Sequence, residues 1–378
     1  MSAPTVEAAV PLVTAAEEKV AAATQLQLTW WRFRRHKLAL ASGVVIILFY
    51  LGALLADFLA VTNPHTTEAA RSYIPPQAIH WFDEDGSFKP HVYALKGRRD
   101  MRTFKLVYAP DPADKRYLTL FAEGYSYTLL GVFETNRHLL GLDRDKPEDA
   151  LFLLGTDQLG RDLWSRLMLA TRTSLTIGLI GVTLSLFLGV LLGGLSGLYG
   201  GVVDTVIQRV IEILRSIPTI PLWMGLAAAL PNTWSVTEVY IAITVIISLI
   251  GWTELARVVR GRFLALREED FVTAAELAGA SRLRIIFRHM VPSFLSHIIA
   301  AISLALPAMI ISETTLSFLG LGLRPPAISW GVLLQDAQNI QALGIAPWLL
   351  IVAVPVIIVI LAFNFLGDGL RDAADPYG

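Results

Sequence analysis

The sequence predicts an all-α polytopic membrane protein with six transmembrane helices and a small β-containing extracytoplasmic insert between the first two. The first observation is composition: of 378 residues, 54% are hydrophobic and only 17% are charged, whereas soluble chains carry about a quarter charged residues. The second is the length of the apolar runs, which approach the roughly 20 residues needed to cross a bilayer. The third is the aromatic composition of residues 62–150, which differs from the rest of the chain.

Charge and cysteine content exclude several classes of protein. The 31 Lys and Arg residues nearly balance the 32 Asp and Glu residues, so the basic surplus that nucleic-acid binding requires is missing. The chain has no cysteine, which excludes disulfides, thiolate nucleophiles and cysteine-bound metals. We expect no metal site, because the histidines of the insert lie far apart in the sequence: His65, His80, His91 and His138.

Residues 38–61 form the first predicted crossing. Just before them, residues 30–37 combine two tryptophans with several Arg and Lys side chains. Because Arg and Lys favour the cytoplasmic side and Trp favours the interface, residues 1–37 should form a cytoplasmic tail. A cleaved signal peptide is the alternative, but its apolar core would be shorter and closer to the start of the chain.

Five further apolar stretches complete the predicted bundle. They span residues 173–198, 206–230, 238–255, 294–319 and 347–366. Pro218 and Pro221 should kink or break the third crossing. Six crossings place both termini in the cytoplasm. The loop charges agree, since residues 256–293 contain seven arginines and residues 320–346 contain only Arg324.

Residues 62–150 must then lie outside, although they contain many basic side chains, because segments this long cross the membrane largely regardless of charge. Short aromatic runs such as 104–108 and 117–121, separated by Gly, Pro and Asp, predict a small sheet. A segment of this size buries only a modest core, so we expect it to lean on the helices or on a partner. Two interpretations stay open: the insert meets a substrate-delivery protein or lines the entrance, or it is a packing cap.

The cytoplasmic loop 256–293 carries the most specific pattern. An acidic group suits the start of a helix (Glu268, Glu269 and Asp270), and Gly279 suits its end. A second, amphipathic helix runs to Pro292, with four apolar side chains on one side: Leu283, Ile286, Phe287 and Met290. Small side chains would let another protein surface come close: Ala274, Ala275, Ala278 and Ala280. A short helix seated in a partner's groove is a known docking mode.

This loop resembles the Glu-Ala-Ala loop of ATP-binding-cassette importer permeases. Four positions match that pattern: Ala274, Ala275, Gly279 and Pro292. Two depart from it, Thr273, where Glu is usual, and Val291, where Leu is usual. The resemblance implies a coupling helix that fits a cleft in a cytoplasmic ATPase. The implied coupling residues are Glu268, Glu269, Asp270, Thr273, Ala274, Ala275, Glu276, Gly279, Ala280, Arg282 and Pro292. For the acidic trio, an ordinary solvated helix start is the alternative.

Four further stretches are similar to the dipeptide/oligopeptide subfamily of these permeases. They are residues 155–162 with 172–175, residues 312–322 with 329–331, the tail 364–376 and the basic aromatic segment 31–37. The resemblance covers about 30–61 and 151–378. It implies the type I importer permease fold, with residues 151–378 as its transmembrane domain.

The resemblance also implies partners and a location. The partners are a homologous sister permease, two cytoplasmic ATPase subunits, an extracytoplasmic solute-binding protein and the lipid of a bacterial inner membrane. No Gly-x-x-x-x-Gly-Lys-Ser/Thr loop occurs in the sequence, so ATP and Mg should be bound by the separate ATPases, and we expect no enzyme activity or cofactor in this chain. The implied cargo is di- or oligopeptides, and oligosaccharides, nickel or other small solutes are the alternative.

Three residues of the fifth crossing are candidates for a translocation pathway or gate: Ser303, Pro307 and Glu313. A charged carboxylate at membrane depth costs about 2.5–3.5 kcal/mol, so Glu313 should face protein or water. A structural hydrogen bond or ion pair between helices is the alternative for Glu313, and a simple kink is the alternative for Pro307.

Two more groups have competing interpretations. Either an ion-pair cluster forms on the outer face from Asp157, Arg161, Asp162 and Arg166, or Thr156 or Asp157 simply caps the following helix. For the small-residue positions Gly193, Gly194 and Gly197 we expect close helix packing.

Two other classes of membrane protein fit the sequence less well. An ion-gradient-driven secondary transporter should show inverted repeats with interrupted helices, but residues 294–366 do not repeat residues 173–255. A channel or receptor subunit is the other class, and the sequence has no evident filter loop.

Overall fold

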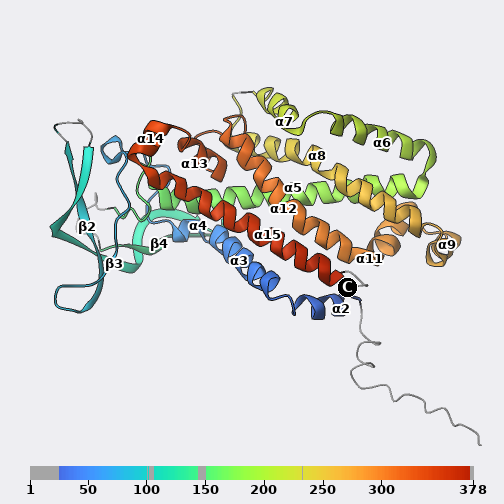
Figure 1. The fold of residues 1–378 in the computed structure, drawn as a ribbon, viewed down its shortest axis with the longest axis horizontal. Coiled ribbons are helices and arrows are strands. Elements are labelled where there is room, and N and C mark those ends of the chain that lie inside the picture. The colour runs from blue at the N-terminus through green and yellow to red at the C-terminus, as the bar shows by residue number, and fades with distance from the viewer. Residues whose placement is uncertain (1–24, 100, 102–105, 144–149, 232, 375–378) are drawn as a thin grey trace, which may run out of the picture.

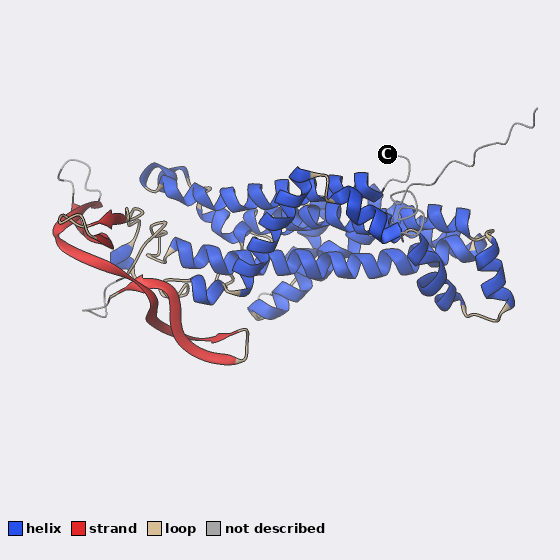
Figure 2. Ribbon diagram, turned by 90° about the horizontal axis from the view of Figure 1, so that it is seen from below, coloured by secondary structure: helices blue, strands red, loops and turns tan. Residues whose placement is uncertain are grey.

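The computed structural model of the chain describes residues 25–99, 101, 106–143, 150–231 and 233–374. These residues form a long helical bundle with a twisted β-sheet at one end and short helices at the other (Figure 1, Figure 2). Parts of three predicted segments lie outside the described residues. They are 1–24 of the predicted cytoplasmic tail, 100, 102–105 and 144–149 of the insert, which include the start of the predicted aromatic run 104–108, and 375–378 of the C-terminal end.

Five helices of the described residues are long and apolar enough to cross a membrane, or six if a bent pair counts as one span. The five are α3 (Lys37–Leu54), α5 (Leu163–Tyr199), α8 (Val236–Leu266), α12 (Leu295–Phe318) and α15 (Ala353–Ala374), the last preceded by η3 (Pro347–Val352). The bent pair is α6 (Gly201–Ser216) and α7 (Thr219–Ala228), which meet at 87°. The predicted fold class is therefore confirmed. Shorter elements are α2 (Gln25–Phe33), α4 (Ala56–Leu59), η1 (Ala69–Arg71), α13 (Trp330–Asp336) and α14 (Ile340–Ile345).

The observed crossings differ from the predicted ones mainly at their ends. α5 begins at Leu163, well before the predicted start at 173. Its cap is Asp162, whose side chain accepts a hydrogen bond from the Ser165 N–H (2.8 Å), so the predicted caps at 156 and 157 are wrong. α8 runs to Leu266, past the predicted end at 255. The predicted break of the third crossing is confirmed, because α7 starts directly after Pro218.

The most extensive helix–helix contact joins α5 and α8, and glycines on α5 make it possible. A Cβ atom at Gly193 would lie 2.5 Å from the carbonyl oxygen of Ala256, and one at Gly197 would lie 2.5 Å from the Cβ of Phe263. The two backbones approach more closely than any side chain on these faces would allow. The expected close packing of the small-residue stripe is confirmed.

The other long helices complete the bundle around one main core. α12 packs against α15, and α15 packs against α3. Trp330 of α13 is completely buried in this core. On α3, apolar side chains such as Ile47 and Leu48 remain exposed on the chain's surface, which is typical of a helix that faces lipid or another membrane subunit.

The segment between α4 and α5 forms an antiparallel four-stranded sheet in the order β1-β2-β3-β4. The strands are β1 (His80–Phe82), β2 (Phe88–Arg99), β3 (Leu106–Leu129) and β4 (Phe133–Leu142). The long strand β3 pairs with β2 through its first half and with β4 through its second half. Figure 2 shows the β3–β4 hairpin turning back toward the helices. The predicted small sheet is confirmed.

Hydrogen bonds fasten the sheet segment to the helical bundle. The indole Nε1 of Trp164, at the start of α5, donates to the Leu59 carbonyl at the end of α4 (2.8 Å). The buried ring of His138, on β4, lies within hydrogen-bond distance of the Asp57 carbonyl (2.9 Å) and the Tyr125 carbonyl (3.1 Å). The insert leans on the helices, as the sequence predicts.

The α5–α8 contact predicts the effect of adding a side chain. We expect Gly193→Val to lower the free energy of unfolding by about 1–3 kcal/mol, because the new methyl groups must push α8 away. Gly261→Val on α8 is the matched control, since no heavy atom lies within 4 Å of its Cβ position. Thermal unfolding of the purified variants in detergent measures both. Equal stability of the two variants would show that the helices are not in close contact.

Candidate coupling site and buried polar clusters

Two short helices project beyond the end of α8, at the end of the bundle opposite the sheet (Figure 1). The first is α9 (Asp270–Leu277). The second is one continuous stretch made of α10 (Arg282–Arg284), η2 (Ile285–Met290) and α11 (Val291–Ser293), which leads into α12. We call residues 270–293 the helical hairpin.

Gly279 ends the first helix of the hairpin, as predicted. Its φ of +76° lies in the left-handed region, which residues with a side chain rarely adopt. Its N–H donates to the Glu276 carbonyl (2.9 Å), and the Ala280 N–H donates to the Ala275 carbonyl (3.0 Å). These are the paired hydrogen bonds of a Schellman motif, so the turn has one defined geometry.

An arginine ties the two helices of the hairpin together and holds them to the bundle. Arg282, at the start of the second helix, forms an ion pair with Glu276 of the first. Its guanidinium carbon also lies over the ring of Tyr199, the last residue of α5, at 5.7 Å from the ring centre. The hairpin is therefore braced across its turn and against α5.

The helical hairpin sits on a hydrophobic cluster that it shares with α5 and α8. The hairpin contributes Val272, Ala275, Ile285, Ile286 and Met290, α5 contributes Val190 and Leu198, and α8 contributes Val259 and Phe263. The second helix is the firmest part of this contact, since Ile285, Ile286 and Met290 are completely buried. Because close-packed cores transmit displacement, a movement of the hairpin must move α5 and α8.

Two expectations about the faces of the hairpin are wrong. Ala275 is only 8% exposed and packs against this core instead of being offered to a partner. Leu283 and Phe287 are 53% and 42% exposed, so they do not join the buried side. The π turn over Ile285–Met290 explains the difference, because its wider spacing turns two consecutive isoleucines inward together.

The outward face of the hairpin combines apolar and charged side chains. Leu277 is 86% exposed and Phe271 is 41% exposed. Most predicted coupling residues are also exposed: Glu268, Glu269, Asp270, Thr273, Ala274, Glu276, Gly279, Arg282 and Pro292. Ala280 is half-buried. Exposed apolar side chains rimmed by polar ones are typical of protein–protein contact surfaces.

Glu313 is completely buried in α12 and has hydrogen-bond partners. Its carboxylate accepts hydrogen bonds from the Ser174 hydroxyl of α5 (3.0 Å) and the Ser317 hydroxyl (2.8 Å). Ser174 Oγ accepts in turn from the Trp330 N–H (3.1 Å), and Ser317 Oγ from the Leu323 N–H (3.0 Å). We call these residues the Glu313 cluster. It joins α5, α12 and the loop before α13, which favours the structural interpretation of Glu313.

The other two pathway candidates lie deeper in the same helix. Ser303 is buried, its hydroxyl donates to the Ile299 carbonyl (3.0 Å), and a Cβ atom at Gly367 of α15 would lie 3.4 Å from its own Cβ. Pro307 lies inside α12. Ser303 therefore faces α15, and the structure does not bring it to Glu313.

An ion-pair cluster lies at the start of α5 and contains three of the four predicted residues, Asp157, Arg161 and Arg166, while Asp162 caps α5. Arg161 Nε lies 2.6 Å from the Asp157 carboxylate, and Arg166 Nε lies 3.6 Å from the same oxygen. Arg161 also reaches Asp336 of α13 (3.4 Å). Burial, and after it the charge of Asp157, raises the pKa of Asp336. The cluster fixes the outer loop that carries α13 against α5.

One half-buried ion pair was not predicted from the sequence. Arg260 of α8 binds both carboxylate oxygens of Asp204 on α6 (2.5 Å each), and the Ser196 hydroxyl of α5 donates to the same group. The pair joins three helices at the end of the bundle that carries the hairpin. The available signal was an acidic residue near the start of one apolar run, Asp204, and a group of arginines just after another, Arg257, Arg260 and Arg262.

The chain is similar to membrane components of transport systems. The oligopeptide transport system permease protein OppC of Bacillus subtilis is 37% identical over 236 residues, which are 62% of this chain and 75% of that protein. The dipeptide transport system permease protein DppC of Lactococcus lactis is 32% identical over 368 residues, which are 95% of this chain and 93% of that protein. The second alignment is long enough to include the outer sheet segment.

The fold and these relatives define a polytopic membrane transport protein. Residues 189–377 match the profile described as binding-protein-dependent transport system inner membrane component, and residues 24–76 match the N-terminal transmembrane domain of oligopeptide transport permease C. The chain therefore belongs to the family of binding-protein-dependent transport system inner membrane components. The resemblance to ATP-binding-cassette importer permeases of the dipeptide/oligopeptide family is confirmed. A solved structure of the MetNI methionine ABC transporter aligns with a TM-score of 0.43 at 18% identity, over 56% of this chain and 97% of that chain.

The Glu313 cluster predicts a graded effect of substitution. We expect Glu313→Leu to destabilise the bundle by about 1–3 kcal/mol, because it leaves two buried serine hydroxyls without their acceptor. Glu313→Gln keeps the shape and an acceptor oxygen, so its effect should be smaller. Ser312→Ala is the control on the same helix, since this half-buried serine donates to the Ala308 carbonyl and is not part of the Glu313 cluster. Thermal unfolding ranks the stabilities of the three variants. If Glu313→Leu is as stable as Ser312→Ala, the structural role of Glu313 is contradicted.

Proposed function

We propose that the chain is one permease subunit of an ATP-driven importer of di- and oligopeptides in a bacterial inner membrane. The observation that carries this proposal is the helical hairpin, whose inner side shares a core with α5 and α8 while its outward face is exposed. Peptide cargo is supported by relatives that are named for oligopeptide, dipeptide and glutathione transport.

The hairpin acts as a lever in this mechanism. ATP binding closes a pair of cytoplasmic ATPase subunits, and the hairpin, seated in a cleft of one of them, moves with it. Since Val272 and Ile286 pack in the same cluster as Phe263, this movement shifts α5 and α8. The bundle then passes between inward-open and outward-open arrangements, a two-state equilibrium that nucleotide biases.

The predicted coupling residues divide into two groups in this contact. Those on the outward face meet the ATPase: Glu268, Glu269, Asp270, Thr273, Ala274, Glu276, Gly279, Arg282 and Pro292. Ala275 and Ala280 lie on the inner side and seat the hairpin on the bundle. Phe271 and Leu277 add apolar anchors that sequence analysis did not single out.

The pathway candidates act indirectly in this proposal. Substrate passes between helices of this chain and of a homologous sister permease, and α12 forms part of the wall. Ser303, Pro307 and Glu313 determine where that wall lies, because their contacts fix α12 against α15 and α5.

The remaining partners follow from the same architecture. A second ATPase subunit binds the sister permease, and the ATPases bind ATP and Mg, because this chain has no phosphate-binding loop. Both termini lie in the cytoplasm and the sheet lies outside. Exposed aromatic side chains of the sheet, such as Trp81 (55%) and Phe82 (64%), offer an extracytoplasmic solute-binding protein a docking surface.

Enlarging the turn of the hairpin tests the coupling contact. We expect Gly279→Trp to weaken binding of the ATPase subunits about tenfold or more, a loss of 1.4 kcal/mol or more, because an indole on the exposed turn blocks the cleft. Co-purification of the ATPases with the tagged permease, and ATP hydrolysis by the complex, measure the effect. Membrane insertion should be unchanged.

Gly86→Trp is the matched control for this variant. Gly86 lies in the β1–β2 turn of the outer sheet with a φ of +75°, and no heavy atom lies within 4 Å of its Cβ position. The same holds for Gly279. Both variants therefore carry the same backbone strain, and only Gly279→Trp should lose the ATPases. Equal assembly of the two complexes would count against the hairpin as the coupling site.

Cysteine labelling tests the orientation in the membrane. The chain has no cysteine, so one introduced residue reports its own side only. Arg98→Cys on β2 should react with a membrane-impermeant maleimide added to spheroplasts, whereas Arg284→Cys in the hairpin should react only in inside-out vesicles. Both side chains are exposed. The reverse labelling pattern overturns the proposed topology.

A further inference from the structure

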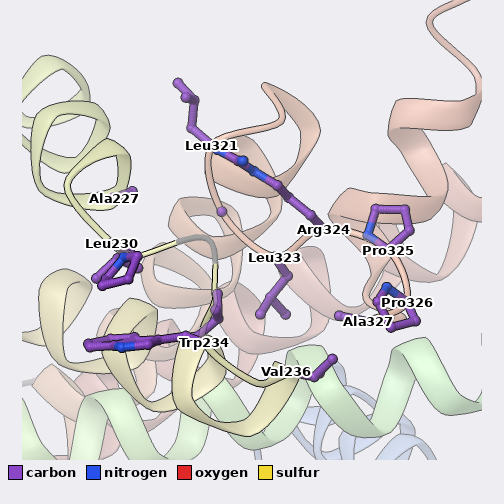
Figure 3. Close-up of a pocket in the computed structure, with 13 residues that line it drawn as sticks. Ala227, Leu230, Trp234, Val236, Leu321, Leu323, Arg324, Pro325, Pro326 and Ala327 are labelled. Carbon is purple, nitrogen blue, oxygen red and sulfur yellow. The ribbon is translucent and has the colours of Figure 1, made fainter.

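A cavity of about 250 Å³ lies between the turn that joins α7 to α8 and the loop that joins α12 to α13. Its lining combines apolar and aromatic side chains, three prolines and one charged residue, Arg324. Figure 3 shows Arg324 along one edge, Trp234 on the opposite side, and Leu323 between them. The cavity lies at the ends of α7, α8 and α12 that point toward the sheet (Figure 1).

Arg324 is a cation without a carboxylate partner among the described residues. Arg324 is exposed, and its Nε donates to the Gly320 carbonyl (2.9 Å), which uses one of the five N–H groups of the guanidinium. No acidic residue lines the cavity. Glu238 of the following helix is already engaged, because its carboxylate accepts from the Ser235 N–H (2.6 Å) in the capping box of α8.

The loop that carries Arg324 is held rigidly. The N–H groups of Leu321 and Gly322 donate to the Leu316 carbonyl (3.1 and 2.9 Å), and the Ala327 N–H donates to the Arg324 carbonyl (2.9 Å). The Leu323 N–H bonds to Ser317 of the Glu313 cluster (3.0 Å). A preorganised arginine loses little freedom on binding, which favours recognition of an anion.

The lining of the cavity suits a ligand that has an apolar part beside an anionic group. Sites for small molecules are mostly apolar with a few polar groups that fix orientation, and they span about 300–1,000 Å³ for drug-sized ligands. A smaller cavity holds one end of such a molecule. Arginine matches the geometry of carboxylates and of phosphates, and an unmodified peptide carries only carboxylates. The C-terminal residue of a peptide has both features, a side chain and a carboxylate next to it.

We propose that this cavity receives the C-terminal residue of the incoming peptide, with Arg324 binding its carboxylate and Trp234, Leu230 and Leu323 surrounding its side chain. This inference rests on the proposed function and adds a subsite for one end of the substrate. The subsite orients peptides at the outer mouth of the pathway, before they pass between the helices.

Paired peptides test the subsite in the complete transporter reconstituted into liposomes. A hydrophobic tripeptide and its C-terminal amide are supplied on saturating solute-binding protein, and uptake per ATP hydrolysed is compared. We expect wild-type complexes to favour the free acid on the order of tenfold, the size of one charged hydrogen bond. Arg324→Gln should bring that ratio close to one, and Arg324→Lys, which keeps the charge, should give an intermediate ratio.

Arg98→Gln on the outer sheet is the matched control and should keep the wild-type ratio, since it changes another exposed arginine on the same side. An Arg324→Gln complex with an unchanged acid-to-amide ratio overturns the proposal. A second outcome also overturns it: the Arg324→Gln complex loses uptake of both peptides equally and needs more solute-binding protein to reach its half-maximal rate. That result would mean that Arg324 binds a carboxylate of the solute-binding protein. Wild-type complexes that import neither peptide would overturn the proposed function itself, an outcome distinct from the other two.

Discussion

The close approach of α5 and α8 is the constraint on which the rest of the structure depends. Gly197 of α5 leaves room for Phe263 of α8, and Phe263 is also part of the cluster beneath the helical hairpin. The same side chain therefore sets the spacing of the two longest helices and the position of the hairpin. A buried polar contact midway along the pair, from the Ser248 hydroxyl to the Gly181 carbonyl (3.1 Å), adds a directional link between the two helices.

α5 also organises the opposite end of the molecule. The arginine cluster that reaches Asp336 lies in the loop just before α5 and in its first turn, and Ser174, farther along, belongs to the Glu313 cluster. Both clusters bind the segment around α13, so the outer loop is held by buried polar groups and not by apolar packing alone. In the Glu313 cluster each hydrogen bond has a defined donor and acceptor, so a shift of the loop would leave a buried polar group without its partner.

Features that depend on local sequence could be predicted. The number of crossings follows from the length of apolar runs, the break of the third crossing from Pro218, the end of the first hairpin helix from Gly279, and the outer sheet from its turn residues. In each case the type of one or a few residues, or the length of an apolar run, determines the local structure independently of the surrounding contacts.

Features that depend on packing could not be predicted. α5 and α8 extend beyond their apolar runs, where no proline stops them. Contacts with other elements maintain these extensions: Thr171 of α5 accepts a hydrogen bond from the Trp330 indole, and Phe263 of α8 packs against Gly197 of α5. The exposure of Leu283 and Phe287 follows from a π turn that the underlying core imposes. Arg260 and Asp204 come together only where α6 crosses α8, and no periodic pattern in the sequence predicts that crossing.

α5 runs without interruption for 37 residues, about 55 Å, from the arginine cluster to the seat of the hairpin. A continuous helix can transmit a displacement from either of its ends to the other. In the proposed importer, thermodynamic linkage is reciprocal: if the ATPase bound to the hairpin changes the affinity of the outer loop for a ligand, that ligand changes the affinity of the hairpin for the ATPase by the same factor. The ATPase subunits that move the bundle therefore also respond to its state, and ATP hydrolysis depends on whether the entrance at the outer loop is occupied.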